Sequence, residues 1–359
     1  MNFEKRNISI MILIFLLFTV NAYAQLPEKA MKNILVSKKS RELYDIKALK
    51  IFEVWKYQFL PDVKTGLFFN YNEAYGVKYN SNADITEEIF VRYDAENKNY
   101  VTVQKIIYSY ENDGVISKRQ VYYYDGRKNT LVLNEQELYA VDSNRNVIEK
   151  KVYCKSDIQK SFKYNYDRNS NMIECVEYNS HGDPAVKTIN LFDKSGLKYK
   201  SDIFLEPDLR RITTINYDSK ENEIQVLNYN CQGKLVSSVE NIFDISENTE
   251  ESRLIVGRDT LNITFYKYDE LKNIIEKKVV DQNGVVISKT TYKYDDKFNV
   301  VEETDFALNF DEKTRQRELK CIEILRHSYN EMNKRSQTIA SEFNGRVTSK
   351  TVYEYKKSE

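Results

Sequence analysis

The stretch YDELKNIIEKKVVDQNGVVISKTTYKYD, residues 268–295, contains one complete unit of a repeat. An aromatic residue followed by Asp opens the unit, and the same pair closes it. Along the chain this pair recurs at steps of 26, 25, 26, 25 and 26 residues, at Tyr166-Asp167, Phe192-Asp193, Tyr217-Asp218, Phe243-Asp244, Tyr268-Asp269 and Tyr294-Asp295. A fixed period of this length is typical of a repeat architecture.

Each period contains two turn signals. An Asn five positions after the aromatic residue ends the first turn, and an aliphatic residue follows two positions later, as in Asn273 and Ile275. The second turn reads Asn/Asp-x-x-Gly and ends at Gly182, Gly233 or Gly284. Asn or Asp at the first position and Gly at the fourth favour a type I turn in which Gly has a positive φ. In the first turn, we assign the left-handed conformation to the Asn.

The segments between the turns predict strands, because they are rich in β-branched and aromatic residues. Short turns join antiparallel strands, since parallel neighbours need long crossovers. We therefore predict an all-β fold, an antiparallel β-hairpin repeat array with two strands per repeat that forms a long curled or spiral sheet. A parallel β-helix with one coil per period is the alternative.

The period divides the chain into three regions. Tyr93-Asp94 and Tyr124-Asp125 are earlier, less regular copies of the pair, so the repeat domain is assigned to residues 91–359. Residues 25–90 are interpreted as an N-terminal cap, because repeat arrays need atypical end units. Within it, residues 26–39 predict a short amphipathic helix. Residues 51–60, which contain the only Trp, Trp55, predict a strand and a weaker candidate binding site.

The aromatic-Asp pair and its two turn signals resemble the YD (RHS-type) repeats of bacterial secreted and cell-surface proteins. The segment from Phe192 to Leu197, FDKSGL, is most similar to the pattern of that family. The sequence departs from the pattern where the glycine before the Asn is replaced, at Arg145, Ser170, Glu221, Lys272 and Phe298. The resemblance implies a β-repeat fold, an extracytoplasmic location and an interaction role. It implies no catalytic activity.

The first 24 residues are predicted to be a signal peptide. Lys5 and Arg6 precede a 13-residue apolar stretch, residues 8–20, and Ala22-Tyr23-Ala24 fits a cleavage site. The apolar stretch is short for a membrane span, which needs about 20 residues. We therefore expect a secreted, periplasmic or cell-surface protein without a transmembrane segment after cleavage. An uncleaved signal anchor is the alternative.

Charge and cysteine content restrict the partners. The 54 basic and 54 acidic residues give a net charge of zero, and no polybasic segment occurs, so nucleic acid is a poor candidate partner. The four cysteines, Cys154, Cys175, Cys231 and Cys321, match no metal-binding spacing. We expect mostly free, buried thiols, with one disulfide as the alternative. No cofactor or metal is predicted.

Paired tyrosines are the candidate binding residues. Residues two apart in a strand share a face, so tyrosine columns are predicted on one face of the sheet. They offer flat apolar rings with polar tips, on which sugars could stack or an extended partner could lie. Packing within the fold is the competing explanation. The candidates are Tyr122, Tyr124, Tyr164, Tyr166, Tyr266, Tyr268, Tyr292 and Tyr294.

No catalytic signature stands out in the sequence. His181 lies in a predicted turn, His327 takes a place that other repeats give to Tyr, and the repeated Asp is expected in every turn. We therefore expect a non-enzymatic scaffold that binds a polysaccharide or a protein at the cell surface. The alternative is a glycan-acting hydrolase. A group of carboxylates with raised pKa in a deep cleft would distinguish the hydrolase.

Overall fold

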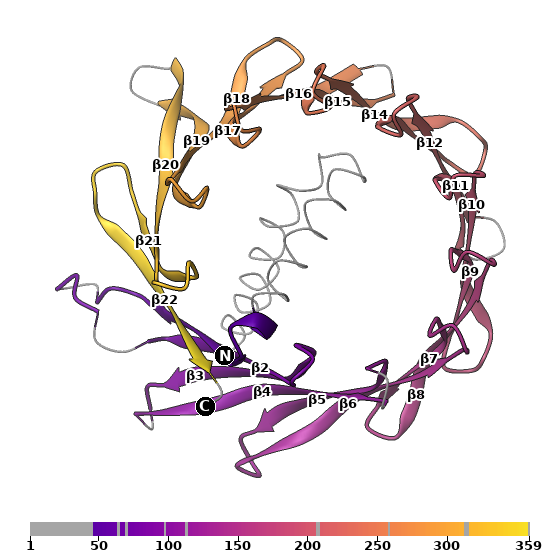
Figure 1. Cartoon of the computed structure of the whole chain (residues 1–359), viewed down its shortest axis with the longest axis horizontal. Coiled ribbons are helices and arrows are strands. Elements are labelled where there is room, and N and C mark those ends of the chain that lie inside the picture. The colour runs from indigo at the N-terminus through magenta and orange to yellow at the C-terminus, as the bar shows by residue number, and fades with distance from the viewer. Residues whose placement is uncertain are drawn as a thin grey trace.

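The chain folds into one antiparallel sheet that closes into a barrel (Figure 1). The computed structural model describes residues 46–62, 65–68, 71–96, 98–111, 114–205, 209–257, 259–311 and 316–357. The predicted signal peptide and the predicted helix over residues 26–39 lie outside these ranges. A helical turn at residues 46–48 precedes the first strand. Among the described residues, no helix is long and apolar enough to cross a membrane.

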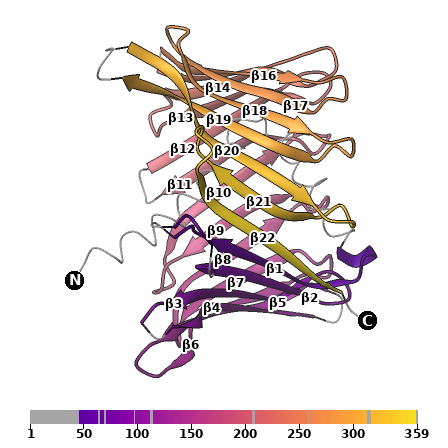
Figure 2. The same ribbon diagram turned by 90° about the vertical axis from the view of Figure 1, so that its left-hand side faces the viewer.

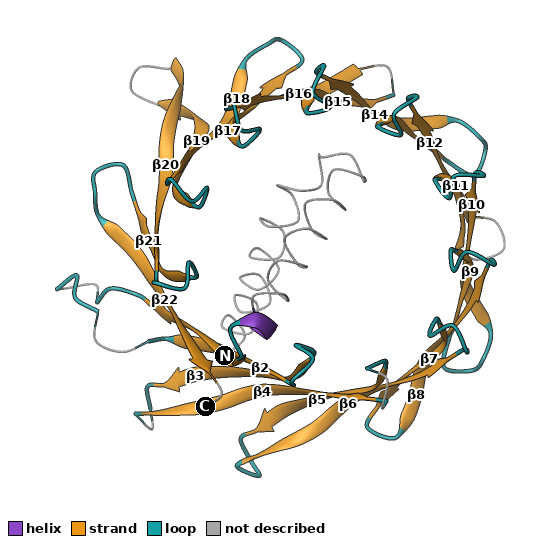
Figure 3. Cartoon of the chain, in the orientation of Figure 1, coloured by secondary structure: helices purple, strands orange, loops and turns teal. Residues whose placement is uncertain are grey.

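The described residues form 22 strands in chain order. Figure 3 shows them as a ring joined by turns at two rims. Their bounds are β1 Ile51–Phe59, β2 Glu73–Tyr79, β3 Ile85–Asp94, β4 Asn99–Tyr110, β5 Ile116–Asp125, β6 Thr130–Val141, β7 Val147–Cys154, β8 Asp157–Tyr166, β9 Met172–Tyr178, β10 Pro184–Phe192, β11 Lys198–Leu205, β12 Leu209–Tyr217, β13 Glu223–Tyr229, β14 Leu235–Phe243, β15 Thr249–Val256, β16 Asp259–Tyr268, β17 Ile274–Asp281, β18 Val286–Tyr294, β19 Val300–Asp311, β20 Gln316–Tyr329, β21 Arg335–Ser341 and β22 Val347–Lys357.

The predicted antiparallel meander is confirmed, but the predictions of a spiral sheet and of a parallel β-helix are wrong. Each strand pairs with its neighbours in the chain, and β1 also pairs with β22, with Val54 opposite Tyr355. Figure 2 shows these two strands side by side. The right-handed twist of the strands curls a long sheet, and closure removes both free edges. The strands β1 and β2 and most of β3, predicted to belong to a cap, are continuous with the rest of the barrel.

At one rim, here called the aspartate rim, an Asp or Asn side chain organises most of the described turns. Asp269 Oδ1 accepts the backbone N–H groups of Leu271 and Asn273 at 2.9 and 2.8 Å, and its Oδ2 accepts the Asn273 amide. The residue before this Asn, and not the Asn itself, adopts the left-handed conformation. The residues directly before the Asn, Arg145, Ser170, Glu221, Lys272 and Phe298, all have φ between 62 and 68°.

At the other rim, here called the glycine rim, the Asn/Asp-x-x-Gly turns form as predicted. The N–H of Gly233 bonds the carbonyl of Asn230 at 3.0 Å, and φ of Gly233 is 74°. Tyr93-Asp94 and Tyr124-Asp125 also lie at this rim, because β3 and β5 end there. The interpretation of these two pairs as earlier copies of the repeated pair is therefore wrong, since β3 and β5 run opposite to the strands that end in that pair.

The register separates the two faces of the sheet. Thr264, Tyr266 and His327 share one face and are 1, 5 and 8 % exposed. We assign this face to the inside of the barrel, because the concave side of a curved sheet is the more crowded one. The opposite, outer face carries many ion pairs at the aspartate rim, including Lys267–Glu276 at 3.1 Å and Lys293–Glu302 at 2.8 Å. Such exposed pairs each contribute little to stability.

A hydrogen bond to one carbonyl connects successive repeats on the inner face. Where the pair starts with Tyr, its hydroxyl donates to the first strand residue after the preceding aspartate-rim turn, as in Tyr268 to Thr249 at 2.8 Å. Where the pair starts with Phe243, the Asn241 amide donates to the equivalent carbonyl, that of Glu223, at 3.0 Å. Asn190 does the same beside Phe192, with Met172 as acceptor. A Tyr hydroxyl in some repeats and an Asn amide in others therefore satisfy the equivalent carbonyl acceptor.

Candidate functional site

The predicted tyrosine columns fall into two groups. Tyr166 and Tyr294, like Tyr268, direct their hydroxyls to the preceding repeat, at 2.9 and 2.8 Å from the carbonyls of Val147 and Ile274. Tyr164, Tyr266 and Tyr292 lie two residues before them on the same inner face. These six residues line the inner wall near the aspartate rim, and three of them have an observed bond within the fold.

Tyr122 and Tyr124 do not join these columns. Tyr122 lies opposite Lys105, whose ammonium contacts Glu87 on the outer face at 2.5 Å. Tyr124 is two residues further along β5 and bonds Asn129 at the glycine rim, at 2.6 Å. The structure thus separates these two residues from the other six by face and by rim.

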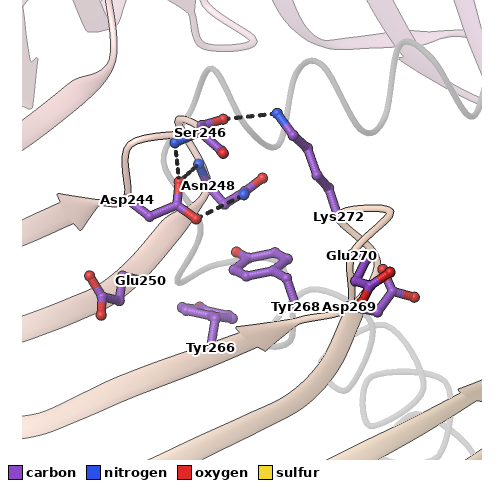
Figure 4. A pocket seen from close by; sticks show the side chains of 9 residues that line it. All are labelled: Asp244, Ser246, Asn248, Glu250, Tyr266, Tyr268, Asp269, Glu270 and Lys272. Atoms are coloured by element: carbon purple, nitrogen blue, oxygen red, sulfur yellow. Dashed lines mark hydrogen bonds between the residues drawn. The ribbon is translucent and has the colours of Figure 1, made fainter.

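A pocket opens between two neighbouring turns of the aspartate rim, and we call it the acidic pocket (Figure 4). Its volume is about 400 Å³. The turns after β14 and β16 form its sides, and the rings of two tyrosines on β16 lie between them. It is lined by Asp244, Ser246, Asn248, Glu250, Tyr266, Tyr268, Asp269, Glu270 and Lys272.

The hydroxyl of Tyr266 has no hydrogen-bond partner among the described residues, although the side chain is only 5 % exposed. Leaving a buried hydroxyl unpaired costs about 1–3 kcal/mol. Burial raises the pKa of Tyr266, so the hydroxyl stays protonated. Burial, with the charge of Asp244, also raises the pKa of Tyr268 to about 12. This unpaired group is the unusual feature of the acidic pocket.

A second candidate site, here called the aromatic cluster, lies on the outer face of β1, β3 and β4 at the glycine rim. Its members are Trp55, Tyr57, Phe59, Tyr71, Tyr93 and Tyr100. Ring centroids are 5.9 Å apart for Trp55 and Tyr57, 5.0 Å for Tyr57 and Tyr71, and 4.0 Å for Tyr71 and Tyr100. Tyr100 is 37 % exposed at the end of this row.

Polar contacts hold the aromatic cluster in place. The Trp55 indole N–H donates to Glu53 at 2.8 Å, and the Tyr57 hydroxyl donates to Glu354 at 3.0 Å. The Trp55 ring covers Gly76, where a β-carbon would come within 2.8 Å of the ring, so only glycine fits opposite this Trp. Burial raises the pKa of Tyr71 and of Tyr100, so both phenols remain neutral hydrogen-bond donors.

Sequence reasoning identified Trp55 but missed the other members of the aromatic cluster. Tyr71, Tyr93 and Tyr100 lie outside the repeat period and come from different connections. Asn72 brings them together, because its N–H bonds Gln58 at 2.8 Å and its carbonyl accepts the N–H of Tyr93 at 3.0 Å. The high local density of aromatic residues between positions 52 and 100 was the available signal.

The histidines and cysteines have local roles. His181 is exposed in its turn, and His327 on the inner face contacts the Thr338 hydroxyl at 2.9 Å. All four cysteines are free, but Cys231 is exposed and the other three are only half-buried, so the prediction of buried thiols is wrong. Within the described ranges, no group of three or more His, Cys, Asp or Glu side chains could hold a metal ion.

One pair of carboxylates lies on the inner wall. Asp305 and Glu323 are directly opposite in the register of β19 and β20. Burial and the charge of Asp305 raise the pKa of Glu323. Asp305 accepts a hydrogen bond from the Thr290 hydroxyl at 2.6 Å. Two carboxyl groups that face each other and have unequal affinities for a proton can perform acid–base chemistry.

Comparisons with known proteins reveal only distant structural likeness. No protein-family model and no curated protein matches the chain. A crystal structure of TcdB2-TccC3 is 9 % identical with a TM-score of 0.32; the match covers 77 % of this chain but only 20 % of that one. A porin-like protein from Bacteroides uniformis is 8 % identical over 86 % of this chain and 97 % of its own, with a TM-score of 0.32. A DUF3836 family protein from Parabacteroides distasonis is 16 % identical over 30 % and 89 %, with a TM-score of 0.18.

Proposed function

We propose that this protein is an exported, non-enzymatic scaffold that binds a polysaccharide at the cell envelope through its aromatic cluster. This proposal rests on the row of rings formed by Trp55, Tyr57, Tyr71 and Tyr100. The centroids of consecutive rings are 4.0 to 5.9 Å apart, and the last ring, Tyr100, is 37 % exposed. Such a row offers an apolar surface longer than one sugar ring.

The chemistry of the aromatic cluster favours a sugar polymer over a protein. Four of its six members are tyrosines, whose rings combine an apolar body with a hydroxyl that can bond sugar hydroxyls. The carboxylate of Glu354, which accepts the Tyr57 hydroxyl, lies beside the row and can accept further hydrogen bonds. Trp55 is held rigidly over Gly76, so its ring needs little reordering on binding.

Export and repeat family are part of the same proposal. The predicted signal peptide over residues 1–24 supports delivery to the periplasm or cell surface. The left-handed φ at Arg145, Ser170 and Phe298 supports a divergent YD-type repeat, because these residues adopt the conformation of the glycine that they replace. The conformation persists although the glycine is absent.

The test is retention of the purified protein in native gels that contain soluble polysaccharides of different composition. We expect at least one polysaccharide to retard the protein. Tyr100→Ala removes the exposed ring and should weaken that retention about tenfold, which corresponds to about 1.4 kcal/mol. The matched control is Tyr199→Ala, because Tyr199 is 43 % exposed but lies outside the aromatic cluster.

Equal retention of the two variants would refute the aromatic cluster as the binding site. Absence of retardation by every polysaccharide, together with capture of a defined protein that Tyr100→Ala abolishes, would replace the polysaccharide by a protein partner. Thermal unfolding of both variants, measured alongside, should show that each is fully folded in the assay, so that lost retention reports on binding and not on unfolding.

A glycan-acting hydrolase is the second candidate function, and the pair Asp305 and Glu323 favours it. Directly opposite residues in an antiparallel sheet have β-carbons about 4.5–5.5 Å apart, which fits the closely spaced carboxylates of retaining glycosidases. The raised pKa of Glu323 would suit a general acid. Glu323→Gln should abolish any glycan hydrolysis by the wild type; if the wild type hydrolyses no glycan, this candidate fails.

A further inference from the structure

We propose that the acidic pocket binds an amino sugar that carries a free, protonated amino group. This inference does not depend on the aromatic cluster, which lies on the other face and at the other rim. The lining side chains of the pocket contribute four carboxylates and one ammonium group, a net charge of −3. A volume of about 400 Å³ falls within the usual range for small-ligand pockets.

Two of the four carboxylates already have partners. Asp244 and Asp269 each accept two backbone N–H groups and the amide of an Asn in their own turn. Hydrogen bonds from Asn273 hold the pKa of Asp269 below its usual value, so that carboxylate stays ionised. These groups contribute charge to the pocket without being available for direct contact.

Glu250 and Glu270 are the available acceptors. They lie on opposite sides of the pocket with the tyrosine rings between them (Figure 4). The ammonium of Lys272 donates to the carbonyl of Ser246 at 3.1 Å and closes one side. An ammonium group between the two glutamates would therefore be attracted to both.

The buried hydroxyl of Tyr266 indicates a polar ligand. Tyr266 lines the pocket and is only 5 % exposed. Its hydroxyl has no hydrogen-bond partner among the described residues. A ligand hydroxyl could pair with it, since a phenol both donates and accepts. A ligand that satisfies the glutamates and this phenol must combine a cation with hydroxyl groups.

Comparison among the repeats supports a specific role. Glu250 lies six residues after the turn aspartate, Asp244. In five other repeats this position holds a large, exposed aliphatic or aromatic side chain: Ile148, Ile173, Tyr199, Ile224 and Ile275. A carboxylate replaces these apolar side chains in the repeat that forms the acidic pocket. The hairpin does not need this charge, since its neighbours fold without it.

The experiment is titration of the full chain with glucosamine near pH 6.5, followed by NMR or calorimetry. We expect glucosamine to bind at least tenfold more tightly than glucose, N-acetylglucosamine or methylamine. Glucose and N-acetylglucosamine lack the cation, and methylamine lacks the hydroxyls. Equal binding of glucosamine and glucose, or of glucosamine and methylamine, would overturn the proposal.

Four variants locate the site. Glu250→Gln should weaken glucosamine binding at least fivefold, and Tyr266→Phe, which removes only the unpaired hydroxyl, at least threefold. Glu221→Gln changes a carboxylate in a turn outside the pocket and should bind as the wild type does. Tyr100→Ala should also bind glucosamine normally, which separates this site from the aromatic cluster. Unchanged binding by both Glu250→Gln and Tyr266→Phe would refute the assignment.

Discussion

At the scale of single residues, the repeats have the same hydrogen bonds in common more than the same residues. The hydroxyl of Tyr217 and the amide of Asn241 reach equivalent carbonyls in successive repeats. Phe298 adopts a left-handed φ of 63° at the position where Gly196 has 83°. Such a conformation costs an L-residue about 1–2 kcal/mol, which the side-chain and backbone bonds of the turn offset.

The exchange between Tyr and Asn predicts a rescue. Asn241→Ala should leave the buried Glu223 carbonyl unpaired and lower the free energy of unfolding by about 1–3 kcal/mol. Adding Phe243→Tyr should restore at least half of the loss, because a hydroxyl at this position reaches the same carbonyl in other repeats. Urea unfolding measures both. A double variant no more stable than Asn241→Ala would contradict the equivalence.

His327 predicts a pH dependence of stability. Burial, with the charge of Arg335 added, lowers its pKa to about 4 from 6.5, so the folded state binds its proton less readily than the unfolded state. The contribution of neutral His327 is complete above pH 6.5 and falls as the pH drops towards 4. From pH 7 to pH 5 it should fall by about 2 kcal/mol.

The control is His327→Gln, which removes the titrating group and retains a donor for Thr338. Urea unfolding at both pH values should show a smaller decrease for this variant than for the wild type. Identical decreases would show that other groups cause the pH dependence.

At the scale of the hairpin, each described strand forms its backbone pairs only with its two neighbours in the sheet. β13, for example, pairs only with β12 and β14. A turn defect should therefore be felt first in the adjacent strands. This locality distinguishes the barrel from a fold with a central core, where a defect would weaken all strands together.

Gly233→Val tests this locality. A β-carbon at Gly233 would have no atom within 4 Å, so the penalty comes from the positive φ of 74° and not from a clash. We expect a loss of about 1–2 kcal/mol. Hydrogen exchange should increase first in β13 and β14 and later in distant strands such as β5. The control is His181→Ala, in an equivalent exposed turn, which should change neither the free energy of unfolding nor the hydrogen exchange. A uniform increase of exchange over all strands of Gly233→Val would contradict the expectation.

At the scale of the whole molecule, the period and the strand direction could be predicted from the sequence, but closure could not. The aromatic-Asp spacing defines hairpins because turn chemistry is local. The pairing of Val54 with Tyr355 joins residues about 300 positions apart, and it depends on the accumulated twist of the sheet. The predicted side-chain face was wrong at Tyr122 because the register places this residue opposite Lys105, on the outer face.

The candidate sites show the same division. Tyr266 could be placed in a column from the sequence, but its unpaired hydroxyl depends on the pocket around it. Trp55 could be identified as unusual, whereas Tyr71 and Tyr100 reach it through connections without a periodic pattern. Local chemistry was therefore predictable, and contacts between distant segments were not.

Removal of β22 tests closure. A chain that ends at residue 346 would leave the backbone groups of β1 and β21 unpaired, and exposed edges associate with other chains. We expect oligomers by size-exclusion chromatography with light scattering. A chain that ends at residue 357 keeps β22 and should behave as the full chain does. A monomeric, equally stable 346-residue variant would show that the β1–β22 pairing does not stabilise the barrel.

Antiparallel pairing between the first and last strands also restricts how the number of strands can change during evolution, because it requires an even number of strands. An odd number of strands would bring β1 and its closing partner into parallel alignment, so gain or loss of a single strand would break the observed antiparallel closure. Duplication of one period of 25 or 26 residues adds two strands and about 9.6 Å to the circumference, and the ring can close again. In a closed barrel of this kind, the smallest insertion that preserves closure is therefore one whole hairpin.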